Sequence, residues 1–325
     1  MRKPIYLDYA ASTPLDKGVL EAMMPYLRRH YGNPSSQHSF GQKARAAIEQ
    51  AREQASRFLG CNADEVIFTS GATEANNLVM KGAIQNTKPH IVTTAIEHES
   101  VLEPCRSLEK EGIAEVTYVA PQKDGIVRAE DVMGAIKPNT VLVSVMYANS
   151  EIGTVQPVGE IGAAIQELRR NKKQAYPVFH SDAVQAANFL DCNTQTLQVD
   201  LLTLSSHKIY GPKGVGVLYK RNKMPLKAVL EGGGQEMGVR SGTENVAAIV
   251  GMGAALEALH NPRMLVTNIK IRQLRDKLIK GVLRRIPDSK LTGSAERRLA
   301  NNAHFRFRGV EGRDVVVLLD QKGIA

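Results

Sequence analysis

The chain has 325 residues, of which 43% are hydrophobic and 23% are charged, and its formal net charge is +9. That length suits two domains, or one large core with an appendage. The composition excludes disordered, collagen-like and disulfide-scaffold proteins. No apolar run approaches the roughly 18 residues of a membrane span, and the N-terminus lacks a signal-peptide pattern. We therefore expect a cytoplasmic protein with no membrane association.

The cysteines and the excess positive charge further narrow the class of protein that the sequence can encode. Cys61, Cys105 and Cys192 are far apart and form no CxxC pair, so we expect no disulfide framework, no metal site and a reducing compartment. From Asn261 onward the chain holds 15 lysines and arginines against 6 acidic residues. No RNP or zinc-finger pattern accompanies this charge, so a solvated helix face is favoured over direct nucleic-acid binding. A surface that meets an acidic partner is the open alternative.

Between about residues 14 and 254, helical stretches alternate with short β-branched runs, which is typical of an α/β fold with a mostly parallel central sheet flanked by helices. The strands are expected at residues 65–68, 90–94, 116–119, 141–146, 178–180, 201–204 and 214–219. Several of them lack polar alternation, so helices should cover both faces. The clearest helix spans residues 39–59 behind an expected Ser39 N-cap. Its predicted core stripe consists of Phe40, Ala44, Ile48, Ala51, Ala55 and Leu59.

The C-terminal part differs from this pattern. A basic helix over residues 264–285 is followed by strand-like runs over 303–308 and 315–319, and the sequence then stops within a helix-to-strand turn over 320–325. These elements predict a large domain over residues 15–258. They also predict a small α+β domain, made of residues 1–14 and 259–325, that is incomplete at its C-terminus.

The strongest chemical signal is the polar loop around Lys208, which follows the strand expected at 201–204. A lysine that is partly desolvated there can form a Schiff base with an aldehyde cofactor, and Ser205 and His207 could hold a phosphate group. On this segment alone an ordinary surface lysine is the simpler interpretation. Lys213 could equally be the reactive amine.

Asp182 lies 26 residues before Lys208, at the end of the strand expected at 178–180. That separation is enough for a crossover between neighbouring parallel strands, so both side chains could reach one crevice at the carboxyl ends of the sheet. A carboxylate there could pair with a protonated pyridine nitrogen. Taken alone, Asp182 is more typical of a helix N-cap.

Two further segments end at the same predicted edge. After the strand at 65–68, the free N–H groups of Gly71, Ala72 and Thr73 at a helix start would form a phosphate cradle, although an ordinary βα turn is equally consistent. His98 follows the strand at 90–94 and could stack on an aromatic cofactor, or be merely structural. Residues 231–245 are too rich in glycine for a strand or helix, and their Arg240, Ser241 and Thr243 offer donors to an anion.

Taken in order, eight motifs closely resemble the pyridoxal-phosphate-dependent cysteine desulfurases of the class V aminotransferase type. They are YLDYAASTP, YGNPSS, TSGATEANN, EHES, ANSEIGT, HSDAVQ, SSHKIYGPKG and GGGQEMGVRSGTEN. The resemblance runs from residue 4 almost to the last residue. It implies a pyridoxal 5'-phosphate (PLP) fold-type I enzyme that removes sulfur from L-cysteine, leaves L-alanine and supplies iron-sulfur cluster assembly or tRNA thiolation through a sulfur-acceptor protein.

The resemblance also implies a role for each matching residue. Lys208 would be the Schiff-base lysine, Asp182 the pyridinium partner and His98 the acid/base that stacks on the ring. The phosphate contacts would be Ala72, Thr73, Ser205 and His207 of one subunit and Thr243 of the other subunit of a homodimer. Further contacts would be Gln185 to the phenolic oxygen, Asn149 or Ser150 to the cofactor, and Asn33 to the substrate carboxylate.

Family members carry their nucleophilic cysteine on a mobile loop, in a segment such as SGSAC, at a position beyond Ala325. We therefore expect this sequence to bind the cofactor but to form no persulfide at that position. None of the three cysteines matches the loop, and Cys105 is expected to be a small buried hydrophobe. The open alternatives are a selenocysteine lyase, an aminotransferase of the same fold, and a truncated, non-catalytic binding subunit.

Overall fold

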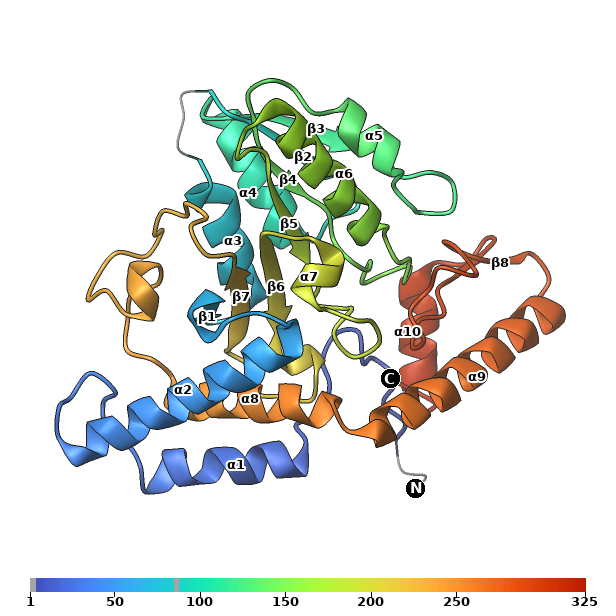
Figure 1. Cartoon of the computed structure of the whole chain (residues 1–325). Coiled ribbons are helices and arrows are strands. Elements are labelled where there is room, and N and C mark those ends of the chain that lie inside the picture. The colour runs from blue at the N-terminus through green and yellow to red at the C-terminus, as the bar shows by residue number, and fades with distance from the viewer. Residues whose placement is uncertain (1–3, 85–87) are drawn as a thin grey trace.

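The computed structural model describes residues 4–84 and 88–325. Its centre is a sheet with the strand order β1-β7-β6-β5-β4-β2-β3 (Figure 1). Only β7 runs antiparallel to its neighbours in this sheet, so the predicted α/β class with a mostly parallel sheet is confirmed. The strands are β1 Val66–Thr69, β2 His90–Thr94, β3 Glu115–Val119, β4 Thr140–Ser144, β5 Val178–Asp182, β6 Leu201–Ser205 and β7 Gly216–Lys220. Each lies within two residues of its predicted position.

Alternate strand residues build two hydrophobic cores, one on each face of the sheet. Leu201 of β6 packs in the core beneath α3 (Ala72–Gly82) and α4 (Glu99–Lys110). Its neighbours Leu202 and Leu204 pack in the opposite core, because successive side chains of a strand point to opposite faces. The helices that contribute to this second core are α1 Lys17–Arg28, α2 Ser39–Leu59, α5 Ala129–Gly134, α6 Val158–Lys172, α7 Thr194–Leu197 and α8 Val246–Leu259. Both faces are therefore covered, as the unbroken apolar runs predict (Figure 1).

Helix α2 has the predicted bounds, but two details of its start were wrong. The N-cap is His38, whose Nδ1 accepts the Gly41 N–H at 3.4 Å, so Ser39 is already the first helical residue. Phe40 is 54% exposed and not part of the core stripe. The loop from Asn33 to Ser36 packs on Gly41 in that first turn, where a Cβ would lie 2.3 Å from the Ser36 oxygen. The loop thus covers the side of the turn where Gly41 lies and leaves the Phe40 ring exposed to solvent.

The C-terminal part contains α9 (Pro262–Arg285), a hairpin of β8 (Ser289–Leu291) and β9 (Phe305–Phe307), and α10 (Gly312–Asp320). The predicted strand at 315–319 was wrong, because these residues lie in α10. Valine disfavours a helix by only about 0.5 kcal/mol per residue. Asp314 in the first turn favours the helix start through its interaction with the helix dipole, so the β-branched run does not decide the structure.

The two ends of the described chain lie together. Ile5 forms a parallel bridge with Ile324, and the Ala325 N–H donates to the Ile5 carbonyl at 2.9 Å. These contacts favour the small domain predicted from residues 1–14 and 259–325, and the division from residues 15–258 stays a prediction. Residues 1–3 lie outside the described part. No helix within residues 4–84 and 88–325 is both long and apolar enough to cross a membrane.

Candidate active site at the carboxyl edge of the sheet

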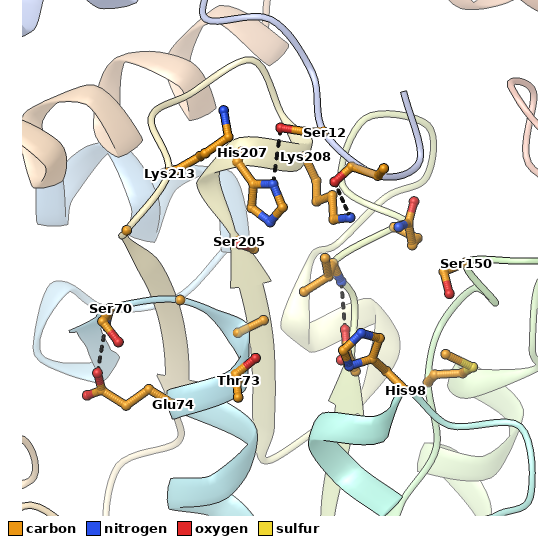
Figure 2. Close-up of a pocket in the computed structure, with 18 of the residues that line it drawn as sticks. Ser12, Ser70, Thr73, Glu74, His98, Ser150, Ser205, His207, Lys208 and Lys213 are labelled. Carbon is orange, nitrogen blue, oxygen red and sulfur yellow. Dashed lines mark hydrogen bonds between the residues drawn. The ribbon is translucent and has the colours of Figure 1, made fainter. Parts of the chain in front are cut away.

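A cavity of about 570 Å³ lies at the carboxyl ends of the parallel strands (Figure 2). The loops that follow β1, β2, β4, β5 and β6 all contribute to it, because parallel strands end at one edge. The predicted site residues that line it are Ala72, Thr73, His98, Ser150, Asp182, Gln185, Ser205, His207 and Lys208. The structure therefore brings together residues that are up to 136 positions apart in the sequence.

Lys208 ends a short 3-10 turn, Ser206–Lys208, directly after β6. Its Nζ donates to the carbonyls of Ala10 and Ala11, the second at 2.8 Å, so the N-terminal segment covers this amine. Burial lowers the pKa of Lys208, although Asp8 and Asp182 oppose the shift. A lowered pKa increases the fraction of neutral, nucleophilic amine.

Lys213 also lines the cavity but is exposed, and in Figure 2 its amine points away from that of Lys208. Of the two lysines that sequence reasoning left open, Lys208 is therefore the better placed nucleophile.

Asp182 is the last residue of β5 and is buried beside the cavity. Its Oδ1 accepts the Val184 N–H at 3.0 Å, and its Oδ2 accepts an amide hydrogen of Asn76 at 2.8 Å. Burial raises the pKa of Asp182, while these hydrogen bonds and the nearby His98 and Lys208 act against that rise. No helix of the described chain begins here, so the N-cap interpretation of Asp182 was wrong. A buried carboxylate of this kind is suited to face a cationic ring nitrogen.

His98 is the N-cap of α4, and its Nδ1 accepts the Ser100 N–H at 3.1 Å. The Ser100 hydroxyl lies 2.8 Å from the same nitrogen. The cap fixes the ring beside the cavity that His98 lines (Figure 2). His98 thus has the structural role that the sequence allowed and also lines the cavity.

The predicted phosphate cradle is the start of α3. Gly71 precedes the helix with φ 152°, a conformation open to glycine. Within the described chain, the N–H groups of Ala72 and Thr73 have no hydrogen-bond acceptor. His207 lies across the cavity, and burial lowers its pKa, together with the positive charges of Lys208 and Lys213. Free N–H groups at a helix start beside two lysines suit an anionic group.

The loop after β4 settles which of two neighbouring side chains faces the cavity. The Asn149 amide donates to the Ile96 carbonyl at 3.0 Å, and its Oδ1 accepts the N–H groups of Glu151 and Ile152, each at 2.9 Å. Asn149 therefore shapes the loop and does not line the cavity, whereas Ser150 does. Gln185 also lines it, and its amide donates to the Ala10 carbonyl at 3.0 Å.

Besides Asn149, two predicted site residues lie outside this cavity. Asn33 is exposed, and its Oδ1 accepts the Ser35 N–H at 2.9 Å. Thr243 lines a neighbouring cavity of about 170 Å³, which shares Ser70 and Gly214 with the larger one.

Arg240, expected as a free donor to an anion, instead pairs with Glu74 at 2.8 Å. Burial on its own would raise the pKa of Glu74, but the hydrogen bonds from Arg240 and Ser70 outweigh it and leave that pKa lowered. Arg240 therefore fastens the glycine-rich segment to α3.

None of the three cysteines, all of which lie in the described chain, lines the cavity. Burial raises the pKa of Cys61 and of Cys105 to about 12, with nearby carboxylates adding to the effect. Burial also raises the pKa of Cys192. Because the thiolate is the nucleophilic form, these thiols are poorly suited to attack.

Sequence reasoning missed several residues of the site, chiefly Asn76, Ser100 and the carbonyls of Ala10 and Ala11. Asn76 had a usable signal, because it follows Thr73 by three residues on α3 and so faces the same side of the helix. The N-terminal carbonyls had none, because nothing local shows that residues 10 and 11 cross Lys208.

The fold and the cavity together define the class of protein. A doubly covered α/β sheet with a half-buried lysine, a buried aspartate, a histidine and an anion cradle at one edge is the arrangement of PLP-dependent fold-type I enzymes. The N–H groups of Ala72 and Thr73, which have no acceptor among the described residues, fit the phosphate of this cofactor, and the lowered pKa of Lys208 fits its aldehyde.

The aminotransferase class-V family model matches residues 5–325, and the chain belongs to that family. A cysteine desulfurase IscS of Dictyoglomus turgidum is 46% identical over all of this chain and 81% of its own length. That of Methanosarcina thermophila is 43% identical over 99% of this chain and 78% of its own. A solved NifS-like protein superposes with a TM-score of 0.92 at 36% identity, covering 99% of this chain and 86% of that one. SspA in complex with cysteine gives a TM-score of 0.84, also at 36% identity, over 99% and 88%.

Proposed function

We propose that this chain is a PLP-dependent cysteine desulfurase, which takes the sulfur of L-cysteine and leaves L-alanine. The observation that carries the proposal is one cavity that contains Lys208, Asp182, His98 and the open start of α3. The relatives named as cysteine desulfurases, matched over essentially the whole chain, support the choice of substrate.

Different residues of the cavity would bind different parts of the cofactor. Lys208 Nζ would hold its aldehyde carbon, and Asp182 would face its pyridine nitrogen. The phosphate would be held by Ala72, Thr73, Ser205 and His207, with Ser150 and Gln185 nearer the ring. When bound, PLP supplies a positively charged conjugated ring that takes up the electrons left by bond breaking at the substrate α-carbon.

The side chains of this protein would then handle the protons. Lys208, freed by the incoming cysteine, has the lowered pKa of an effective base and would remove the proton from the substrate α-carbon. His98, fixed by its cap at the start of α4, would exchange protons with groups bound above it. Asn76 and Val184 donate to Asp182 and favour its ionised form, against the burial that raises its pKa.

The sulfur-accepting thiol must come from outside these residues, because Cys61, Cys105 and Cys192 lie away from the cavity. A thiolate would attack the substrate sulfur, so that an S–S bond forms while the C–S bond breaks. The electron pair stays on carbon, which is then protonated to give alanine. We propose a sulfur-acceptor protein for iron-sulfur cluster assembly or tRNA thiolation as the final recipient, in the cytoplasm, where the three free cysteines would stay reduced.

We also propose a homodimer in which Thr243 and Asn33 act on the cavity of the partner chain. Neither residue reaches the cavity of its own chain. Exposed apolar side chains near them support an interface: Tyr31 and Phe40 form an aromatic pair with ring centroids 6.2 Å apart, and Met237 is 52% exposed.

Reduction with borohydride followed by peptide mapping tests the assignment of Lys208. The cofactor-saturated protein should carry a reduced adduct on the peptide with Lys208, and a Lys208→Ala variant should carry none. Lys213→Ala is the matched control, because it lies in the same cavity and should keep the adduct. An adduct on Lys213, or no adduct at all, would contradict the proposal.

Product analysis tests the reaction itself. With cysteine and an external thiol as acceptor, the protein should form alanine and sulfide in equal amounts. Selenocysteine and common amino acids serve as competing substrates. Preferential turnover of selenocysteine, or transfer of the amino group to a keto acid, would replace the proposed activity by one of the alternatives.

Mixed dimers test the role of Thr243. A Lys208→Ala chain combined with a Thr243→Ala chain gives one site with an intact Lys208 and a partner Thr243. If Thr243 acts across the interface, this hybrid retains a cofactor-loaded site. If the hybrid loses cofactor as readily as Thr243→Ala alone, Thr243 acts within its own chain or not at all.

A further inference from the structure

Asn76 lies behind the cavity, at the point where α3, α4 and β5 meet. It is fully buried, with 0% of its surface exposed. Its Nδ2 donates to Asp182 Oδ2 and to Ser100 Oγ, both at 2.8 Å. The Ser100 hydroxyl in turn lies 2.8 Å from His98 Nδ1. The Asn76 amide, through the Ser100 hydroxyl, therefore connects two titratable groups of the cavity, Asp182 and His98.

The direction of each hydrogen bond follows from the donors available. Asp182 lacks a hydrogen when ionised, so the amide nitrogen of Asn76 must face it, and the second amide hydrogen then goes to Ser100 Oγ. Because Ser100 Oγ accepts this hydrogen, its own hydrogen can go to His98 Nδ1. The Ser100 backbone N–H also donates to Nδ1, at 3.1 Å. The neutral ring must then carry its hydrogen on Nε2, the nitrogen with no partner in the described part of the chain.

Burying Asn76 costs free energy of folding, so packing alone does not explain an asparagine at this position. Asn76 Oδ1 is buried without a hydrogen-bond partner in the described structure. An unsatisfied buried oxygen costs about 1–3 kcal/mol, which an apolar side chain of similar shape would avoid. Both amide hydrogens, by contrast, are donated to acceptors at the cavity: one to Asp182, which lines it, and one to Ser100, which contacts His98.

We propose that Asn76 is a positioning residue that sets the tautomer of His98 from the charge on Asp182. This inference rests on the proposed function, since it deepens the roles of those two residues. The ionised carboxylate orients the Asn76 amide, and the amide orients the Ser100 hydroxyl. The hydroxyl, together with the Ser100 backbone N–H, then keeps Nδ1 free of hydrogen. His98 then presents an N–H donor, Nε2–H, as the group available to the contents of the cavity.

Nitrogen NMR of the histidine rings in the cofactor-free protein tests this directly, because the shifts of Nδ1 and Nε2 report which nitrogen carries the hydrogen. The His98 resonances are assigned by their absence in His98→Gln. The wild-type ring should be the Nε2–H tautomer. In Asn76→Asp the new carboxylate accepts the Ser100 hydrogen, so Nδ1 keeps only the Ser100 backbone N–H as a donor and its resonance should shift.

The matched control is Asn77→Asp, at the next position of α3. Asn77 is on the helix surface, where its amide donates to the Thr73 carbonyl at 3.0 Å, and this change should leave the tautomer as in wild type. If Asn76→Asp does not fold, Ser100→Ala removes the hydroxyl that links Asn76 to His98. This change should displace the Nδ1 resonance by itself. An unchanged His98 spectrum in either variant would overturn the proposal.

A kinetic measurement distinguishes this inference from the function on which it rests. In the cofactor-loaded protein, Asn76→Leu should lower kcat on the order of tenfold, the size usual for residues that orient a functional group, with KM changed little. The borohydride adduct on Lys208 should persist in that variant. Loss of the adduct in wild type would sink the proposed function and leave the NMR result standing, whereas a normal kcat in Asn76→Leu would sink only the role of Asn76.

Discussion

The sheet-bearing part of the molecule and the C-terminal part from α9 to α10 differ in how deeply their residues are buried. Strands β1, β2, β4, β5 and β6 are buried along their whole length, between two covered cores. In the C-terminal part, by contrast, α10 buries no residue, and Val316 is 65% exposed. Helix α9 leaves Leu265 68% exposed.

The geometry of the cavity therefore depends mainly on the sheet-bearing part of the molecule. Every residue that lines it lies between Ala11 and Gly214, and the fixed strand ends hold most of them. The joint between the C-terminal part and the loop after β4 includes two hydrogen bonds, in which Asn302 donates to the Glu151 carbonyl at 2.8 Å and Leu299 N–H donates to the Gly153 carbonyl at 2.9 Å. A further contact joins α9 to the sheet-bearing part, where Asn268 donates to the Asn188 carbonyl at 2.7 Å. The exposed apolar helices should matter little to the cavity, and the following changes test that contrast.

The largest effect is expected at the buried ion pair of Arg52 and Glu236, whose Nη1 and Oε2 atoms are 2.8 Å apart. Arg52→Met leaves the Glu236 charge buried and uncompensated, which should lower the free energy of unfolding by about 3–5 kcal/mol. Urea unfolding measures this. The control is Arg57→Met, on the same helix, which breaks the exposed pair with Glu257 and should cost no more than about 1 kcal/mol. Equal losses in both variants would contradict the assignment.

The free energy of unfolding is expected to change with pH because of Glu97, which is buried and precedes His98 in the sequence. Burial raises the pKa of Glu97 to about 8, against the hydrogen bonds from Met146 and Thr94, and with a further rise from Asp182. The native state thus binds an extra proton between the unfolded pKa of about 4.3 and pH 8, so its stability falls as the pH rises through that window.

Replacing Glu97 by glutamine should remove this slope, on the order of a few kcal/mol in total. Urea unfolding at pH 5, 6.5 and 8 should therefore show Glu97→Gln gaining stability relative to wild type as the pH rises. The exposed neighbour Glu99→Gln should follow the wild-type curve. Parallel curves for Glu97→Gln and wild type would rule out a protonated buried acid at this position.

An intermediate effect is expected at the joint between the two parts. Asn302→Ala removes the bond to Glu151 and leaves Nη1 of the buried Arg298 without the oxygen it donates to at 2.6 Å. The loss should be about 1–3 kcal/mol. Thermal unfolding measures the loss, and limited proteolysis should show cleavage in the C-terminal part at lower temperature. Unchanged proteolysis would mean that the two parts are held together elsewhere.

The smallest effect is expected on α10. Val316→Thr changes an exposed side chain, so the free energy of unfolding should stay within about 0.5 kcal/mol of wild type. The contrasting change is Val217→Thr in β7, which puts a hydroxyl into the core and should cost about 1–3 kcal/mol. A large loss for Val316→Thr in a thermal melt would show that α10 is covered in solution.

Much of the fold follows from local patterns. The apolar repeat of α2 gave its bounds correctly, and the β-branched runs placed every strand of the central sheet within two residues. These segments are long or fully buried, so periodicity and packing favour the same structure. Where burial is absent, as in α10, the β-branched run at Val315–Val317 was misleading, because only a weak intrinsic preference remained to be read.

The α/β class, the family motifs and the strand ends that carry Lys208, Asp182 and His98 could be predicted from the amino-acid sequence, because each of these depends on residues that are neighbours along the chain. Three features became visible only in the folded chain. Ala10 and Ala11 cover Lys208, Asn149 turns into its own loop while Ser150 faces the cavity, and Asn76 links Asp182 to His98 through Ser100. Those contacts link segments up to 198 positions apart. Their geometry is set by how the helices pack on the sheet, which no local pattern encodes.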